Sequence, residues 1–495
     1  MLQRLLVFLT PNYGEMRFAK VVTLILSLAL FLRFPFFFRD YIDRDESTFI
    51  LMAQSWVDGF LPYTQLWDLK PPLTFLFFAA IIKIFGKSLL MIRLLGSILV
   101  GITAIYTYKI GAHLSTKKVA FWTAICCVLL QSLFGSVQGV MSEHISVLPF
   151  CMGLYILLSK KDKVWFFVSG LLIGAAILSK LNMVYPAFFL GLFLLYEIIK
   201  DKKVKEELFK LILWVMGMLL ALIITAVPYY LQGKTTIWWD SVFMAPLAYS
   251  STKINSVFHV LPFCAVLLSV ILVLIKFKLL NYRAREIQLL LAILAGIVVS
   301  FLQTGKINGH YLIQLYPFLL LLLGIALNKL KSPKNPNIGY MVFFAALLIP
   351  FESYIEYANI IQNKAQNGSF YNGEGFTVPQ YLLENKIDTK NVFFTEYHIG
   401  YWVLGEMPPT KVAIHPSNIT REELFPFMNN PRKDSMDELV HILEDVRPNV
   451  IVVREKRKVF SKEFPNLNQY VNAYLHDYYT KIAVIDQAAI YKRSK

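Results

Sequence analysis

The chain has 495 residues, of which 56% are hydrophobic and only 17% are charged, and its formal net charge is +16. Soluble domains carry about 25% charged residues, so this composition and the repeated apolar runs exclude an ordinary soluble protein and indicate an integral membrane protein. The Lys and Arg residues gather in short loops between apolar runs, as cytoplasmic loops do. We therefore expect membrane lipids, and no nucleic acid, as partners.

The apolar runs predict eleven membrane-spanning helices. The first run, Val21 to Phe38, is too long for a signal-peptide core and lacks a small-residue cleavage site after it, so we expect an uncleaved first span. A crossing takes roughly 20 apolar residues. The other candidate spans are 89–109, 119–138, 145–158, 164–179, 183–199, 211–231, 256–275, 289–303, 311–328 and 338–352. Basic loops alternate with loops that are not uniformly basic, which predicts a cytoplasmic N-terminus and an extracytoplasmic C-terminal tail.

One further apolar stretch, 72–87, does not fit this alternation. If it crossed the membrane, the basic loop at 109–118 would move outside and the alternation would fail. We therefore expect this stretch to lie along the outer interface, or to dip into the bilayer and return, with Lys83 and Lys87 reaching the headgroups. An additional crossing is the alternative.

From about Glu352 the composition changes to that of a small soluble domain. Four segments predict short strands: 391–396, 411–415, 449–455 and 481–493. Two segments predict helices, Asp434–Val446 and Asn466–Tyr479. The predicted fold is thus an α-helical polytopic membrane domain over residues 1–352, with outer juxtamembrane helices, followed by an extracytoplasmic α/β domain over residues 353–495.

The predicted topology brings the notable ionisable side chains to the outer face. They are Asp45, Glu46, Asp68, Lys70, Glu143, His144, Lys180, Asp240, Lys253, Lys306 and His310, with Tyr311 beside the last. Ionisable groups at membrane depth are costly, so they usually serve a site or pair with one another. A carboxylate can take the proton of an attacking hydroxyl or amine, and cations can hold a phosphate that leaves. This combination suits transfer of a group from an anionic lipid carrier.

The stretch from residue 44 to residue 99 carries a pattern, "RDEST…AQSWVDGFLPYTQLWDLKPPLTFLFFAAIIKIFG…IRLLGSIL". It resembles the first outer loop of the GT-C membrane glycosyltransferases, in particular bacterial relatives of the protein O-mannosyltransferases and the aminoarabinose lipid A transferase. The segments "TGKINGHYLIQLYPFLLLLLGIAL" and "ILSKLN" resemble two further family signatures. The resemblance covers residues 20–330 and implies the GT-C fold.

The resemblance also implies roles for the first outer loop. Asp45 would be the catalytic base or would orient the acceptor, with a helix N-cap as its structural alternative. Glu46 would support Asp45 or merely favour the helix dipole. Lys70 would bind the donor phosphate, or else reach the membrane interface, and Pro71 and Pro72 would fix its backbone.

Two acids and a histidine raise the question of a metal. Asp68 lies near the acidic position that relatives have before the lysine, although a leucine intervenes here, and it would pair with Lys70 or contact a metal. Glu143 matches a second-loop acid that would orient the acceptor, or it is simply solvated. His144 follows it, but one Glu and one His are too few for a site. No cofactor is therefore predicted with certainty, and a divalent metal stays open.

Four residues of the later outer loops resemble groups that lie near the carrier phosphate in relatives. These are Lys180, Lys306, His310 and Tyr311. The last two are expected to open a helix, whose N-terminus favours anions, although His310 could equally be an ordinary interface residue.

The residues and this resemblance together predict a GT-C glycosyltransferase in a bacterial inner membrane, and the resemblance implies that it is an inverting enzyme. It would move a hexosyl or pentosyl group from a polyprenyl-phosphate donor to a lipid, glycan or protein acceptor at the outer face. The alternative from another class is a transporter or flippase of anionic lipid-linked substrates, although transporters often show internal repeats that are not visible here. A polymerase or ligase of surface polysaccharide is a second enzyme alternative.

Overall fold

Helices account for most of the chain that the computed structural model describes, which is residues 13–40, 42–200, 204–252, 257–330, 341, 345 and 348–494. Two compact units are present: unit 1 contains residues 1–35, 93–224 and 254–355, and unit 2 contains residues 36–92, 225–253 and 356–495. Each unit therefore assembles stretches that are far apart in the sequence. The division at residue 352 between a membrane domain and a soluble domain stays a prediction.

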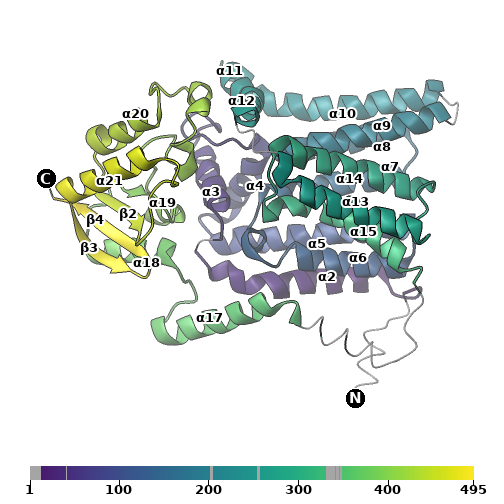
Figure 1. Ribbon diagram of the computed structural model, residues 1–495, viewed down its shortest axis with the longest axis horizontal. Coiled ribbons are helices and arrows are strands. Elements are labelled where there is room, and N and C mark those ends of the chain that lie inside the picture. The colour runs from purple at the N-terminus through teal and green to yellow at the C-terminus, as the bar shows by residue number, and fades with distance from the viewer. Residues whose placement is uncertain are drawn as a thin grey trace. The chain divides into compact units, whose positions relative to one another are not determined.

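Unit 1 is a bundle of apolar helices. Its helices are α2 (Phe18–Arg33), α5 (Leu89–Leu114), α6 (Lys117–Leu130), η2 (Gly135–Gln138), α7 (Ser142–Ser159), α8 (Lys163–Ser179), η3 (Leu181–Met183), α9 (Val184–Lys200), α10 (Val204–Leu231), η5 (Val257–His259), α13 (Leu261–Lys276), α14 (Arg285–Thr304), η6 (Gly309–Gln314) and α15 (Tyr316–Leu327), of which α5 and α10 extend into unit 2. Helix α7 packs beside α8, α9 beside α14, and α6 beside both α2 and α15 (Figure 1). Apolar side chains on almost every side of these helices are typical of membrane spans.

Most of the predicted spans are helices in the structure. Six described helices are long and apolar enough to cross a membrane: Phe18–Phe38, Leu89–Leu114, Ser142–Ser159, Leu181–Lys200, Lys205–Leu231 and Arg285–Thr304. Three predicted spans correspond to shorter apolar helices: Lys163–Ser179, Leu261–Lys276 and Tyr316–Leu327. The predicted span 119–138 is a shorter helix than expected, because α6 ends at Leu130 and a loop follows. The last predicted span, 338–352, lies largely outside the described residues.

The apolar stretch 72–87 forms helix α4 (Pro72–Phe85) in unit 2. Pro72 suits the first helical position because its missing N–H would be unsatisfied there anyway, and Gly86, with a φ of 70°, ends the helix. The helix has 14 residues, which at 1.5 Å per residue is about 21 Å, and the hydrocarbon core is about 30 Å thick. Its interfacial or re-entrant position stays a prediction.

Arg33, at the end of α2, holds the loop of unit 1 between α6 and α7. It is almost fully buried, at 1% exposure. Its guanidinium donates to the backbone carbonyls of Gln131, Val137, Gln138 and Gly139. A planar group with five donors can hold several carbonyls that a lysine could not. The loop that precedes α7 is therefore fixed by one buried cation.

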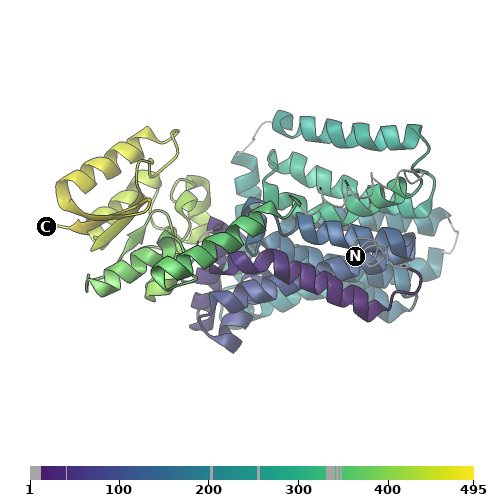
Figure 2. The same ribbon diagram turned by 90° about the horizontal axis from the view of Figure 1, so that it is seen from below.

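Unit 2 contains a small sheet and the helices around it. Its helices are η1 (Phe34–Phe38), α3 (Arg44–Val57), α4, α11 (Thr235–Trp239), η4 (Asp240–Met244), α12 (Ala245–Thr252), α17 (Phe351–Asn367), α18 (Glu374–Glu384), α19 (Ile399–Leu404), η7 (Pro416–Asn418), η8 (Glu422–Met428), α20 (Ser435–Val440), η9 (His441–Val446) and α21 (Pro465–Tyr478), of which η1 and α17 begin in unit 1. The strands are β1 (Phe393–Phe394), β2 (Val450–Arg454), β3 (Tyr479–Ile485) and β4 (Ala488–Arg493). They form a sheet in the order β1-β2-β4-β3, with β1 parallel to β2 and the other pairs antiparallel. Helix α21 packs against β3 (Figure 2).

The predicted α/β character of the tail is confirmed, with one error. Three of the four predicted strand segments contain strands, and both predicted helices are present, the first capped by the side chain of Asp434. The segment 411–415 is not a strand, because a turn follows Thr410 and leads into η7. Its apolar side chains Val412, Ala413 and Ile414 are nevertheless fully buried. The apolar pattern thus predicted burial correctly and the backbone conformation wrongly.

Candidate active site

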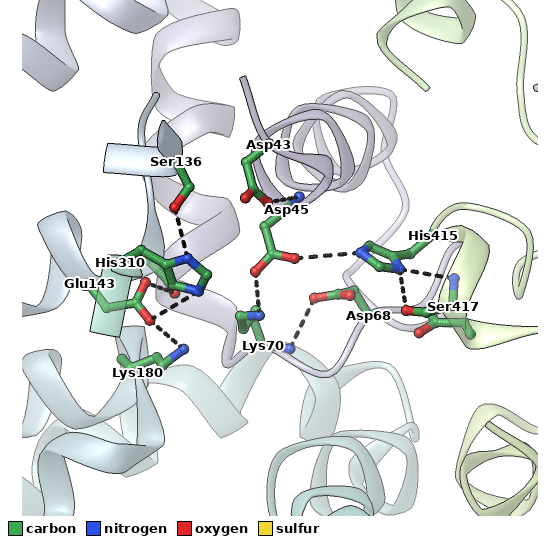
Figure 3. Close-up of polar contacts among 12 residues, drawn as sticks. Asp43, Asp45, Asp68, Lys70, Ser136, Glu143, Lys180, His310, His415 and Ser417 are labelled. Carbon is green, nitrogen blue, oxygen red and sulfur yellow. Dashed lines mark hydrogen bonds and ion pairs between the residues drawn. The ribbon is translucent and has the colours of Figure 1, made fainter. Parts of the chain in front are cut away.

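Asp45 lies in the first turn of α3 in unit 2. The predicted alternative, that Asp45 caps this helix, is wrong, because the cap is Asp43, whose side chain accepts a hydrogen bond from the backbone N–H of Asp45 at 2.9 Å. The carboxylate of Asp45 is therefore available for other partners. Its Oδ2 accepts from the ammonium of Lys70 at 2.9 Å (Figure 3). The structure thus brings together the two most important residues of the predicted first-loop site.

The backbone around Lys70 is held by its own loop. Asp68 accepts from the backbone N–H of Lys70 at 3.2 Å, and the hydroxyl of Tyr63 donates to its carbonyl at 2.7 Å. Tyr63 adopts a φ of 71°, an unfavourable conformation for a bulky residue that the surrounding contacts must maintain. Pro71 then precedes α4 with a φ of −66°. Asp68 therefore positions the lysine through its backbone, and the predicted pairing of Asp68 with Lys70 takes this form.

His415 completes this cluster, and sequence reasoning did not identify it. Its Nε2 lies 3.5 Å from Oδ1 of Asp45, and its Nδ1 lies 2.7 Å from the hydroxyl of Ser417 (Figure 3). The backbone N–H of Ser417 also donates to Nδ1, at 3.3 Å. Because a backbone N–H can only donate, Nδ1 acts as an acceptor, and the ring hydrogen of the neutral imidazole is then on Nε2 and faces Asp45.

Three contacts hold helix α3 against the C-terminal part of unit 2. Arg44 pairs with Glu396 at 3.0 Å, and the indole of Trp402 donates to the side chain of Gln54 at 3.0 Å. Helix α3 also packs against α19. Since α3 carries Asp45, these contacts hold Asp45 close to His415, which lies about 370 positions later in the chain.

The electrostatic setting keeps Asp45 ionised. Burial raises the pKa of its carboxyl, but the charge of Lys70 and the hydrogen bond from His415 lower it more, so that the pKa lies well below its ordinary value. His398, by contrast, is held neutral. Burial lowers the pKa of its imidazole well below the ordinary value, and the proximity of His415 and Arg44 lowers it further. A neutral His398 therefore lies near His415 and adds no positive charge there.

Unit 1 contains a second cluster of predicted site residues. Glu143, in the first turn of α7, is fully buried, and its Oε1 lies 2.7 Å from the ammonium of Lys180. The same oxygen lies 4.0 Å from Nε2 of His310, and Nδ1 of His310 is 3.0 Å from the hydroxyl of Ser136 (Figure 3). Lys180 also lies over the ring of Tyr311, 4.8 Å from its centroid. Four residues predicted from three different outer loops therefore meet in one cluster.

The other predicted residues lie elsewhere. Glu46 is buried, at 2% exposure. It lies on a different face of α3 from Asp45, because consecutive residues of a helix do not share a face. Lys306 is exposed in the loop between α14 and η6. Lys253 lies outside the described residues. Among the residues that the structure describes, no group of three or more His, Cys, Asp or Glu side chains could hold a metal ion, and a role for a divalent metal stays a hypothesis.

Comparison with known proteins bears on these residues. The model of the family described as dolichyl-phosphate-mannose-protein mannosyltransferase matches residues 69–230. This range contains Lys70, Glu143 and Lys180, whereas Asp45 and His415 lie outside it. No curated protein sequence matches the chain.

Two solved structures share the fold over nearly the whole chain. The crystal structure of ArnT from Cupriavidus metallidurans in the apo state has 12% sequence identity and a TM-score of 0.58, and covers 95% of this chain and 97% of that chain. The structure of the same protein bound to undecaprenyl phosphate has 13% identity and a TM-score of 0.52, and covers 96% of this chain and 97% of that chain. The predicted resemblance to GT-C membrane glycosyltransferases is thereby confirmed, and the chain is a multi-pass membrane protein with the GT-C fold.

Proposed function

We propose that this chain is an inverting glycosyltransferase that takes a sugar from a polyprenyl-phosphate donor and transfers it to a hydroxyl or amine acceptor. The observation that carries the proposal is the contact of Asp45 with both Lys70 and His415, in a chain with the GT-C fold. A carboxylate and an ammonium at hydrogen-bond distance can serve as the base for the acceptor and the counter-ion for a departing phosphate. The sugar would be a hexose or a pentose, and the reaction would take place at the outer face of a bacterial inner membrane.

Asp45 would act on the acceptor. Its carboxylate takes the proton of the acceptor hydroxyl or amine while the acceptor atom forms a bond to the anomeric carbon. The bond between that carbon and the phosphate oxygen breaks, and the electron pair leaves with the polyprenyl phosphate. One displacement of this kind inverts the configuration at the anomeric carbon. His415 would hold Oδ1 of Asp45, so that Oδ2 is the oxygen that receives the proton.

Lys70 would change partners during the reaction. In the structure its ammonium is bound to Oδ2 of Asp45 at 2.9 Å, which makes the carboxylate a weak base. The donor phosphate is a diester with one negative charge and gains a second charge as its bond to the sugar breaks, so it would attract the ammonium most strongly as it departs. Asp45 would then lose the partner that contributes most to lowering its pKa and become a stronger base. The base would therefore be strengthened only in the presence of the donor.

The cluster in unit 1 contains groups that can bind a phosphate. Lys180 and His310 both lie within 4.0 Å of the same oxygen of Glu143, so the carboxylate holds two groups that can bind an anion. A buried carboxylate beside a lysine limits the charge that must be desolvated before the donor binds. Tyr311 would fix the ammonium of Lys180 through its ring.

A transfer assay with purified protein in nanodiscs tests the proposal. Radiolabelled polyprenyl-phosphate sugars and a bacterial membrane extract supply donor and acceptor, and labelled product is measured for the wild type, Asp45→Asn and Lys70→Ala. Loss of a general base should lower the rate by about 10²- to 10⁴-fold. The matched controls are Asp58→Asn, at the exposed end of α3, and Lys83→Ala, exposed on α4, which should keep wild-type rates.

Two outcomes would contradict the proposal. Undiminished transfer by both site variants would remove Asp45 and Lys70 from the reaction. Movement of the labelled lipid across the bilayer of proteoliposomes without any transfer would favour the transporter alternative.

A further inference from the structure

A cavity in unit 1 lies away from all the residues discussed above. Its volume is about 380 Å³, and it is lined by Phe18, Tyr108, Lys109, Ala112, His113 and Tyr155. Among the residues that the structure describes, the lining combines aromatic rings with one lysine and one histidine and contains no carboxylate. A concave surface with aromatic walls and a cation is suited to an anionic ligand that has apolar parts.

The ammonium of Lys109 is held by three rings. Its Nζ lies 4.7 Å from the ring centroid of Tyr106, 5.3 Å from that of Phe18 and 5.3 Å from that of Tyr155. Ring faces attract a cation and restrict its position, but they carry no net charge and do not neutralise it. In the part of the chain that the structure describes, no carboxylate lies within ion-pair distance of Lys109. The rings thus fix the position of the Lys109 ammonium and exclude water from one side of it, while its positive charge stays available to an anion.

The cavity lies where three candidate spans end. Phe18 is the first residue of α2, His113 is in the last turn of α5, and Tyr155 is near the end of α7. Helix ends of this kind lie at the level of the lipid headgroups. The adjoining loops and the first turns of the helices beside them are basic. Arg17, Lys160 and Lys161 lie in the loops, and Lys20, Lys117, Lys118 and Lys163 lie in the first turns of α2, α6 and α8. Basic residues beside span ends attract anionic lipids.

We propose that this cavity binds the phosphate of an anionic phospholipid headgroup, with Lys109 as the counter-ion and His113 as a second donor. The acyl chains would continue along the apolar surfaces of the spans, and the rings of Phe18 and Tyr155 would contact the glycerol region. This inference is independent of the proposed transfer reaction, because the basic loops around the cavity are those predicted to be cytoplasmic and none of the lining residues belongs to the proposed site.

Lipid-dependent stability of the full-length protein tests the proposal. The unfolding midpoint of delipidated protein in detergent is measured as phosphatidylglycerol, phosphatidylcholine or glycerol phosphate is added. Phosphatidylglycerol should raise the midpoint of the wild type, whereas the other two compounds should have little effect. Lys109→Gln should weaken the apparent affinity for phosphatidylglycerol by about five-fold, the value expected for one cation near a lipid surface.

Two further variants make the test specific. Lys200→Gln removes a lysine that ends α9 and lies over the ring of Tyr196, 5.9 Å from its centroid, and that does not line the cavity, so it should respond like the wild type. Lys109→Arg keeps the charge and should keep the response even if Lys109→Gln lowers the intrinsic stability. An unchanged affinity in Lys109→Gln, or an equal loss in Lys200→Gln, would overturn the assignment to this cavity. An equal midpoint shift with glycerol phosphate would overturn the assignment to a lipid.

Discussion

Replacing His415 by alanine should weaken Asp45 as a base without removing it. The substitution deletes the imidazole N–H that faces Oδ1 of Asp45 and leaves the ion pair with Lys70 in place. His415→Gln keeps a neutral N–H donor of similar reach and should restore much of the function. The pair of variants therefore separates the hydrogen bond from the remaining properties of a histidine at this position.

The expected magnitude follows from the geometry. Hydrogen bonds to charged groups contribute about 1.5–3 kcal/mol, and a donor–acceptor distance of 3.5 Å is long, so the lower value applies. About 1.4 kcal/mol corresponds to a ten-fold change in rate. We expect His415→Ala to lower kcat about ten-fold with little change in KM for the donor, far less than the effect of Asp45→Asn.

A pH profile distinguishes this role from a purely structural one. The hydrogen bond from His415 lowers the pKa of Asp45, so its removal raises that pKa. Since the ionised carboxylate is the active form, the acidic limb of kcat/KM should move to higher pH in His415→Ala and stay near that of the wild type in His415→Gln. The other titratable or charged groups near this imidazole are Lys70, which binds Asp45, and His398, which Arg44 also influences.

The transfer assay described above supplies the rates, and His441→Ala supplies the control. His441 belongs to the same unit but pairs with Asp445 at 2.8 Å on an exposed surface, so its loss should change neither kcat nor the pH profile. A His415→Ala enzyme with wild-type kcat and an unmoved acidic limb would refute the reasoning. So would a glutamine variant that is no better than alanine while both proteins keep the wild-type unfolding midpoint.

Three further predictions concern stability. The pKa of Asp45 is lower in the folded protein than its ordinary value. The ionised carboxylate therefore contributes fully to the free energy of unfolding above the ordinary aspartate pKa of about 4, and this contribution is lost as the pH falls through the lower folded value. The difference in unfolding midpoint between wild type and Asp45→Asn should shrink below about pH 4. Arg33→Lys should cost about 3 kcal/mol or more of unfolding free energy, since a lysine cannot satisfy the carbonyls that Arg33 holds, whereas Arg39→Lys, at a partly exposed ion pair, should cost less than about 1 kcal/mol. Glu143→Gln should lower the free energy of unfolding by about 3–5 kcal/mol, because it breaks the buried pair with Lys180. The double variant Glu143→Gln/Lys180→Met should recover part of this loss. A double variant no more stable than Glu143→Gln would show that the ion pair is not the cause.

Local physical rules predicted the first outer loop well. The acids at residues 45 and 46 indicate a helix N-terminus, which was the structural alternative for Asp45, and Pro71 and Pro72 were predicted to fix the backbone of Lys70. The predicted topology places Asp45 and Lys70 in one outer-face loop, and their direct ion pair is a finding of the structure. These signals lie within 30 residues of one another, so they needed no knowledge of the tertiary fold.

The partner from the tail could not be predicted in this way. His415 follows the apolar run from Val412 to Ile414, and such a run suits a strand as well as a buried loop. The backbone turns there because Thr410 accepts from the backbone N–H of Ala413 and His415 accepts from that of Ser417. Side chains that bond to nearby backbone compete with sheet formation. The imidazole faces Asp45 because α3 packs against this part of the tail, through α19 and through Thr48, whose hydroxyl donates to the carbonyl of Ile414 at 3.5 Å.

The carboxylate of Asp45, which contacts both Lys70 and His415, links the structure to the proposed order of events. Lys70 cannot neutralise the departing phosphate and keep a full-strength ion pair with Oδ2 of Asp45, because its one positive charge would then be divided between two anions. His415, which approaches the other oxygen, has no such conflict. The carboxylate therefore needs two partners of different kinds: a mobile cation that leaves when the donor arrives, and a neutral donor that stays and keeps the orientation. A second lysine at position 415 would keep Asp45 a weak base throughout the reaction, so we expect His415→Lys to be less active than His415→Gln although it adds a stronger ion pair.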